Sequence, residues 1–295
     1  MGYRLAIADR TYSSWSLRAW LLFDHAGIPV KVETGRLYTD DFARLLRDFA
    51  PARLVPALRL PDGTVIAETM AIAETLAERH TEAGLWPADP SARAMARWLC
   101  AEMHAGFSAL RTHCPMNLGV SYTDCGPDRA VLADVARIEE LWAMARDRFG
   151  AGGPWLFGAW SIADAFFAPV AGRIAGYNLP TGPEAAAYVA AQLADPSFRR
   201  WRAMGKAQNY DQEFYRRNWP TRPWPGPAPR PASPADGPSV NAACPYSGDP
   251  VTDFMECGGR VWGFCNPFCR DKTMADPEAW PAFLSMVEEQ GGFAH

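Results

Sequence analysis

The sequence predicts an α/β N-terminal domain, an all-α domain and a small metal-binding α+β module. Strand and helix patterns alternate at the start, helical patterns fill the middle, and four of the seven cysteines crowd into the last sixth of the chain. A chain of 295 residues exceeds what one compact core usually holds, which favours several domains. The predicted domains span residues 1–82, 88–218 and 241–295, with a linker at 219–240.

The first domain is expected to alternate between strands and helices. Apolar residues recur with a period of two where we predict strands and at helical spacing where we predict helices. The predicted elements are a strand at 3–7, a helix at 14–26, a strand at 30–32, a helix at 40–49, a hairpin at 57–67 and a helix at 69–80. Gly27 is the expected stop of the first helix, and Pro61-Asp62-Gly63 marks the hairpin turn.

The second domain is expected to be helical throughout. Val131, Val135, Ile138 and Trp142, for example, recur at helical spacing. Proline then recurs through residues 219–240, where it removes backbone donors and favours an extended, semi-rigid linker.

Composition excludes two classes of partner. The net charge is -4, with 29 basic and 33 acidic residues interspersed, so no basic stripe predicts nucleic-acid binding. No apolar run approaches the ~20 residues needed to span a membrane. The charged N-terminus lacks a signal core, so we expect a cytoplasmic protein. Thiols stay reduced there, which argues against a disulfide framework.

Four short segments resemble elements of the glutathione S-transferase family. Tyr12-Ser13-Ser14-Trp15-Ser16-Leu17-Arg18 resembles the zeta-class Ser-Ser-Cys-x-x-Arg segment. Residues 54–58 resemble Val-Pro-x-Leu, residues 67–72 resemble Glu-Ser-x-x-Ile, and residues 161–164 resemble the Ser-x-x-Asp capping box. The resemblance covers roughly residues 3–215. It implies a thioredoxin-like N-terminal domain followed by the family's all-α C-terminal domain.

The resemblance implies that Ser13 activates the glutathione thiol, with Ser14 as the neighbouring candidate. A hydroxyl at a helix N-terminus can donate to the sulfur, and the helix dipole favours the thiolate. Trp15 stands where zeta enzymes have cysteine, which argues against a cysteine-based mechanism. The simpler alternative is that these serines only cap the helix.

The resemblance also implies a peptide-binding edge for glutathione. Val55 precedes Pro56, which the family holds as a cis proline, and its backbone is expected to pair with the cysteinyl part of glutathione. Glu68 and Thr69 open another helix, where a carboxylate, a hydroxyl and free amides suit the γ-glutamyl group. Pro56 is in any case a structural bend.

The C-terminal cysteines resemble those of YHS/TRASH metal-binding modules. Cys244 opens a Cys-Pro-x-x-Gly segment, and Cys265 and Cys269 lie one helical turn apart. A unit this small needs a cross-link to stay folded, and in a reducing compartment a bound metal such as zinc provides it. Cys257 is an additional candidate ligand. The alternative is a degenerate module that has lost its metal.

The leading hypothesis is therefore a glutathione transferase that conjugates or isomerises a small electrophile. Maleylacetoacetate isomerase is a minor option, because the basic residue for the diacid falls at Gly176, with Arg173 one turn earlier. The alternatives are a non-catalytic glutathione- or ligand-binding protein and a metal-stress protein. The family resemblance also implies a homodimer. The sequence identifies neither the electrophile nor the metal.

Overall fold

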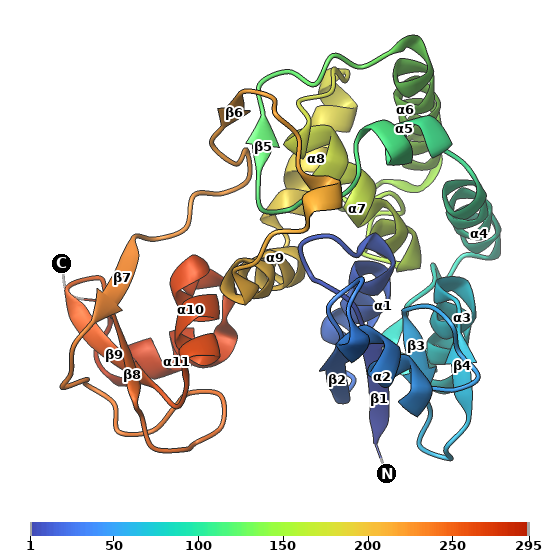
Figure 1. Cartoon of the computed structure of the whole chain (residues 1–295). Coiled ribbons are helices and arrows are strands. Elements are labelled where there is room, and N and C mark those ends of the chain that lie inside the picture. The colour runs from blue at the N-terminus through green and yellow to red at the C-terminus, as the bar shows by residue number, and fades with distance from the viewer. Residues whose placement is uncertain (1, 294–295) are drawn as a thin grey trace. The chain divides into compact units, whose positions relative to one another are not determined.

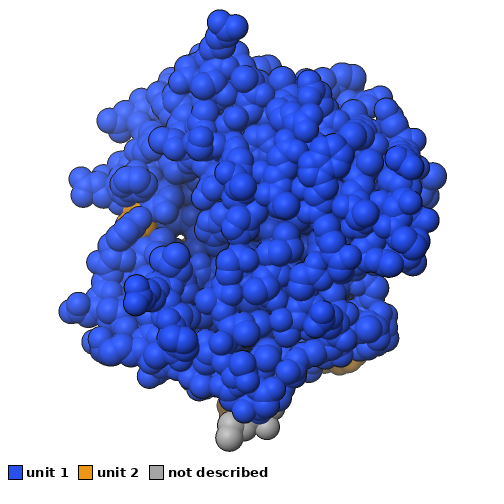
Figure 2. Space-filling model, turned by 90° about the vertical axis from the view of Figure 1, so that its right-hand side faces the viewer, with its two compact units in different colours: residues 1–193, 213–225 blue, residues 194–212, 226–295 orange. Residues whose placement is uncertain are grey.

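A computed structural model describes residues 2–293 and divides the chain into two compact units. The first unit comprises residues up to 193 together with 213–225, and the second comprises 194–212 and the residues from 226 onward (Figure 2). Within the described residues, no helix combines the length and apolar character needed to cross a membrane.

The first unit begins with a four-stranded sheet in the order β2-β1-β3-β4 (Figure 1). Its strands are β1 (Tyr3–Ile7), β2 (Val30–Thr34), β3 (Ala57–Arg59) and β4 (Val65–Ala67). β1 pairs in parallel with β2 and antiparallel with β3, and β3 pairs antiparallel with β4. The accompanying helices are α1 (Ser14–His25), α2 (Asp40–Asp48), α3 (Thr69–Arg79) and the short η1 (Thr81–Ala83). The predicted alternation of strands and helices is confirmed.

A bundle of helices completes the first unit. It contains α4 (Pro90–Ala105), α5 (Ser108–His113), α6 (Arg129–Phe149), α7 (Ile162–Gly176) and α8 (Pro183–Ala194). The short strands β5 (Ser121–Tyr122) and β6 (Thr221–Arg222) pair, and η2 (Glu213–Tyr215) precedes β6. Every residue of α7 is buried, so this helix is the centre of the bundle.

The start of α7 is fixed by the buried carboxyl of Asp164. It accepts hydrogen bonds from the backbone N–H groups of Leu156 (3.1 Å) and Ser161 (2.9 Å) and from the hydroxyls of Ser161 (3.1 Å) and Tyr188 (2.9 Å). Burial raises the pKa of Asp164 to about 6 despite these donors. The native carboxyl therefore keeps its proton to higher pH than the unfolded chain, so its contribution to stability falls as pH rises from 3.8 to about 6.

The second unit combines a three-stranded antiparallel sheet with helices. Its elements are α9 (Pro196–Gln208), β7 (Ala232–Ala235), β8 (Asp253–Cys257), β9 (Arg260–Phe264), α10 (Pro267–Ala275), η3 (Pro277–Ala279) and α11 (Pro281–Glu289). The sheet order is β7-β8-β9, and Met255, Trp262, Phe264 and Phe283 form its fully buried core.

Two boundaries differ from those expected from the sequence. The predicted linker at 219–240 contains β6 and the edge strand β7, where Pro234 sits opposite Met255. Proline is tolerated there because an edge strand leaves half of its donors unpaired. Helix α9, assigned to the helical domain, instead packs on α10, and Arg199 forms a bidentate ion pair with Asp276 at 2.7 and 2.9 Å.

We predict that Asp164→Ala lowers the free energy of unfolding by about 3 kcal/mol, because its buried donors lose their acceptor. Asp128 is the matched control: it caps α6 through Val131 N–H at 2.8 Å but lies exposed. Asp128→Ala should cost about 1 kcal/mol. Urea denaturation of both variants at pH 7 measures the difference. Equal costs would contradict the role given to Asp164.

Candidate functional site

A cavity of about 900 Å³ in the first unit opens at the N-terminus of α1. Its walls come from α1, α2, α5, α7 and η2, from the loops before α2 and β3, and from the segment after α5. The lining residues are Tyr12, Ser13, Ser14, Trp15, Leu37, Tyr38, Phe42, Leu54, Val55, Ser108, Arg111, Thr112, Pro115, Met116, Arg173, Phe214 and Tyr215. This lining contains two arginines and no acidic residue.

The mouth of the cavity is apolar. Leu54, Tyr38 and Phe214 line it and are 73%, 71% and 69% exposed, the highest values among the large hydrophobic side chains of residues 2–293. Tyr12 and Tyr215 pack deeper, with ring centroids 4.7 Å apart. Exposed apolar surface concentrated around a cavity is typical of a site that receives an apolar ligand.

Ser13 is the N-cap residue of α1, but its side chain does not cap the helix. Its hydroxyl donates to the Ser16 hydroxyl at 2.8 Å, and Ser16 in turn accepts from the backbone N–H of Ala8 at 3.0 Å. Ser16 has its own proton, which it can donate back to Ser13. The Ser13 hydroxyl is then free to donate into the cavity.

Ser14 begins α1 and is 8% exposed. Its hydroxyl oxygen accepts a long hydrogen bond, 3.4 Å, from the Arg173 guanidinium. That contact orients the hydroxyl oxygen toward Arg173 and leaves its proton available for a second partner. The structure thus places both serine candidates on the cavity wall.

Two arginines pack on Trp15, and a third, Arg173, lies beside Ser14. The guanidinium carbons of Arg18 and Arg111 lie 4.3 and 5.1 Å from the Trp15 ring centroid. Arg173 donates to the backbone carbonyls of Cys114 (2.9 Å) and Pro169 (3.3 Å). Burial, and then repulsion from Arg111, lower the pKa of Arg173 to about 10, so it stays cationic at neutral pH.

The Val55–Pro56 peptide is cis, as predicted from the resemblance. Val55 lines the cavity, and Pro56 is buried behind it. Within residues 2–293, no backbone hydrogen bond is formed by Val55, which precedes the β3 ladder at Ala57. Its backbone is therefore open to a peptide-like ligand.

Glu68 and Thr69 lie at the start of α3 and are not part of the cavity wall. Glu68 caps the helix: its carboxylate accepts from Met70 N–H (3.0 Å) and Ala71 N–H (3.4 Å). Its other oxygen lies 3.4 Å from Nδ1 of His104, whose ring packs on Trp15. Thr69 is 1% exposed. The structural role of Glu68 is visible, and its expected role in glutathione binding stays a prediction.

In the second unit, the thiols of Cys244, Cys265 and Cys269 lie within 4.8 Å of one another. The Ser247 hydroxyl (3.3 Å) and the Asn266 amide (3.1 Å) donate to the Cys265 sulfur. Burial raises the pKa of Cys244, but backbone and side-chain hydrogen bonds outweigh it and lower the pKa below that of a free thiol. Sulfur atoms with donors around them suit a thiophilic metal, so these residues fit the expected group.

Cys257 is not a member of this cysteine group, which corrects its assignment as a candidate ligand. It pairs with Arg260 beside the hairpin turn of β8 and β9, whereas Cys265 follows the far end of β9. Five residues of extended chain separate these ends by about 17 Å. Cys257 is fully buried instead, and burial raises its pKa to about 11.

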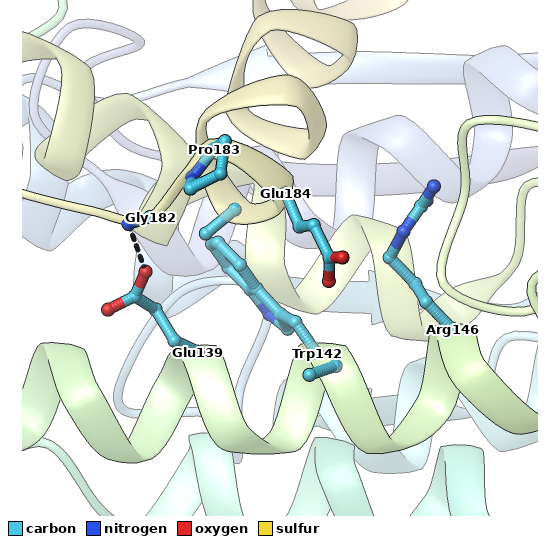
Figure 3. Close-up of a pocket in the computed structure, with 8 residues that line it drawn as sticks. Glu139, Trp142, Arg146, Gly182, Pro183 and Glu184 are labelled. Carbon is cyan, nitrogen blue, oxygen red and sulfur yellow. Dashed lines mark hydrogen bonds between the residues drawn. The ribbon is translucent and has the colours of Figure 1, made fainter.

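A smaller cavity of about 290 Å³ lies between α6 and α8. Figure 3 shows the Trp142 indole between Glu139 and Glu184, with Arg146 to one side. Glu139 already accepts from Gly182 N–H at 2.6 Å. No serine, cysteine or histidine lines this cavity, so it offers no group that could activate a thiol.

Sequence reasoning missed Ser16, Arg111 and the η2 aromatics. Ser16 stands inside the recognised segment, where its spacing from Ser13 could have indicated a hydroxyl pair. Arg111 carries no local signal, because its importance comes from packing on Trp15. Phe214 and Tyr215 lie far along the chain from Ser13, and only the fold brings them to the same cavity.

Residues 12–79 match the family described as "Glutathione S-transferase, N-terminal domain". A probable maleylacetoacetate isomerase of Caenorhabditis elegans is 33% identical over 101 residues, which are 34% of this chain and 46% of that protein. The chain thus matches about half the length of this curated relative. The family match does not extend to residues 241–295.

Solved structures agree on the fold. A glutathione transferase homologue from Burkholderia gl BGR1, with bound glutathione, is 25% identical with a TM-score of 0.53, over 69% of this chain and 98% of that chain. Glutathione transferase Omega 3C from Trametes versicolor is 19% identical with a TM-score of 0.53, over 73% and 92%. The fold is a thioredoxin-like domain followed by a helical domain, and the matches together support the glutathione S-transferase family.

Proposed function

We propose that this chain is a glutathione transferase that activates the glutathione thiol at the N-terminus of α1. The observation that carries the proposal is the position of Ser13 and Ser14 at the first turn of α1, on the wall of a cavity of about 900 Å³. The family match over residues 12–79 covers this segment and supports the proposal.

The chemistry required is stabilisation of a thiolate. A free thiol has a pKa of about 8.5, so most of it is protonated at neutral pH. A hydroxyl hydrogen bond to the charged sulfur contributes about 1.5–3 kcal/mol, which corresponds to roughly one to two pKa units. The helix dipole and the cationic Arg173 beside Ser14 act in the same direction.

We place the peptide part of glutathione along Val55, whose backbone is open, next to Pro56. The γ-glutamyl group would reach the start of α3, where the Glu68 carboxylate suits its amine and Thr69 lies beside it. In conjugation the sulfur forms a bond to carbon and the leaving group departs with its electron pair. In isomerisation the sulfur adds, a bond rotates, and the sulfur leaves again.

Isomerisation of maleylacetoacetate stays a minor alternative, motivated by the Caenorhabditis elegans relative. Gly176 does not line the cavity, and Arg173 does. The other alternative is a non-catalytic glutathione-binding protein, which the tests below distinguish from a transferase.

A second candidate function, metal handling, is favoured by the Cys244, Cys265 and Cys269 group. We propose that these residues hold one zinc or similar thiophilic ion, as in YHS/TRASH-like modules. Three thiolates supply a soft, anionic site that staples a small domain.

We predict that Ser13→Ala raises the pKa of bound glutathione by about one unit or more and lowers kcat/KM about tenfold at pH 7. Glutathione affinity should change little, because the lost bond is strongest to the thiolate. Ultraviolet titration of the bound thiolate and steady-state kinetics measure both effects. Ser91→Ala, an exposed serine on α4, is the control.

The same assay on Ser14→Ala separates the two hydroxyls. Loss of activity only in Ser14→Ala would move the role from Ser13 to its neighbour. Full activity in both variants would refute thiol activation by serine, and glutathione binding without any turnover would favour a binding protein.

We predict that the full chain binds one zinc ion, and that Cys265→Ser abolishes this binding while the matched Cys257→Ser retains it. The Cys265 thiol belongs to the group of three cysteines, and the Cys257 thiol does not. Native mass spectrometry of protein expressed with zinc counts the ion. Equal loss in both variants, or no bound metal in the reduced wild type, would contradict the proposed site.

We predict that the full chain forms a homodimer through its first unit, an expectation taken from the family resemblance. Sedimentation at micromolar concentration should give twice the 32.5 kDa monomer mass. A strict monomer at that concentration would show the expectation to be wrong.

A further inference from the structure

The first unit contains a group of metal-ligating side chains outside the cavity at α1. His113, Cys114 and Cys125 each place one ligand atom, a ring nitrogen or a sulfur, within 4.8 Å of the other two. His113 ends α5, Cys114 follows it directly, and Cys125 lies in the loop between β5 and α6. None of these three residues, called the His113 group below, lines the cavity at α1. The proposed thiol activation therefore does not account for them.

The backbone on both sides of the His113 group is fixed by the fold. Helix α5 ends at Cys114, whose carbonyl accepts a hydrogen bond from Nε of Arg173 at 2.9 Å. Beside Cys125, the Asp124 carboxylate accepts from the Gly126 N–H at 2.8 Å, and Gly126 has a φ of 57°. Glycine adopts this left-handed conformation without strain, so the turn that carries Cys125 is well defined. The two sulfurs therefore meet on a preformed backbone.

His113 has the contacts of a histidine ligand. Its Nε2 lies 3.1 Å from the Cys125 carbonyl oxygen, which can only accept, so Nε2 is the donor. A neutral imidazole that donates from Nε2 keeps an unprotonated Nδ1, which is able to bind a metal. Histidines that ligate metals commonly donate their other N–H to a backbone carbonyl in this way. The ring also stacks on Trp219, with centroids 5.7 Å apart.

The two sulfurs are shielded from water, whereas the imidazole is not. Cys114 and Cys125 are 0% and 3% exposed. His113 is partly exposed and lines a surface cavity of about 360 Å³ together with Asp128 and Trp219. This cavity gives an ion a path from solvent to the ring. Water that entered it would meet the imidazole before the sulfurs.

We propose that His113, Cys114 and Cys125 bind one Cu(I) ion. Thiolates are soft ligands that select Cu(I), which is stable with only three ligands. Zinc is almost always four-coordinate in structural sites. Within residues 2–293, the His113 group contains no fourth histidine, cysteine or acid, and its sulfurs are closed to water. Cys265 and Cys269 are partly exposed, so water can complete a zinc site there.

The charge of the occupied site has a partner nearby. Binding releases the protons of both thiols, and two thiolates with one Cu(I) leave a single negative charge. Arg173 donates to the Cys114 carbonyl and therefore places a cation close to this charge. A buried ion is much less unfavourable when an opposite charge lies close to it. The proposal does not depend on the transferase function.

The test uses the full-length chain with Cys265→Ser and Cys269→Ser, which remove two thiols of the other cysteine group. Cu(I) is titrated without oxygen against the chromophoric chelator bathocuproine disulfonate. The chain should take one equivalent of Cu(I) from the chelator. X-ray absorption at the copper edge should show two sulfur ligands and one nitrogen ligand.

Two variants on this background remove one ligand each, Cys125→Ser and His113→Gln. Loss of an orienting partner alone costs about 10–100-fold in metal affinity, so loss of a ligand should cost at least about a hundredfold. His113 is partly exposed, so His113→Gln keeps the test valid if Cys125→Ser does not fold. Cys100→Ala removes a buried thiol of α4 outside the group and is the matched control. Its affinity should stay within about twofold of the background.

Three outcomes would overturn the proposal. One is a background chain that takes no Cu(I) from the chelator. Another is unchanged affinity in both Cys125→Ser and His113→Gln, because the ion would then be bound elsewhere. The third is a second zinc ion in the wild type that is lost with Cys125→Ser, which would replace Cu(I) by zinc and contradict three-fold coordination. Native mass spectrometry of protein expressed with zinc measures this last outcome.

Discussion

The first unit depends on burying α7 along its whole length. A helix with no exposed residue must satisfy every polar group that it carries inside the protein. Asp164 meets this constraint at one end, where it accepts from Leu156, Ser161 and Tyr188. Arg173 meets it only in part at the other end, because neutral oxygens bind its protons without balancing its charge. The same buried helix thus has a structural end and an end that faces the cavity.

The cavity-facing end of α7 helps to explain how a serine at the start of α1 could act on a thiol. Ser13 is held by Ser16, and Ser14 is held by Arg173, so both hydroxyls are oriented by the core behind them. One hydrogen bond contributes about 1.5–3 kcal/mol to a charged acceptor. Helix dipoles contribute about 0.3–1 kcal/mol more near an exposed end. The hydroxyl is therefore the larger of these two effects, and the dipole assists it.

Much of the first unit could be predicted from the sequence, because short local patterns specify its strands and its site segments. Period-two runs gave the strands, and Ser13, Ser14 and Val55 lie where the recognised segments implied, on one cavity wall. Arg111 could not be found this way, since its role arises from contact with Trp15 far away in the chain. The linker prediction for the proline-rich segment was incomplete because it also depends on contacts distant in the chain. Composition predicted a linker, whereas pairing with β8 makes residues 232–235 a strand. Cys257 was separated from the other thiols by the hairpin register, which composition does not reveal.

A thiolate at the N-terminus of α1 would lie beside a cation. Arg173 contacts Ser14 at 3.4 Å, where the sulfur is expected, and Arg111 shares its cavity wall. At a separation of roughly 6 Å and an effective dielectric constant of about 20, one guanidinium attracts a thiolate by about 3 kcal/mol. Burial of Arg173 is unfavourable in the free protein, because its hydrogen-bond partners are neutral oxygens. The same charge would favour the ionised form of a thiol bound at this helix end.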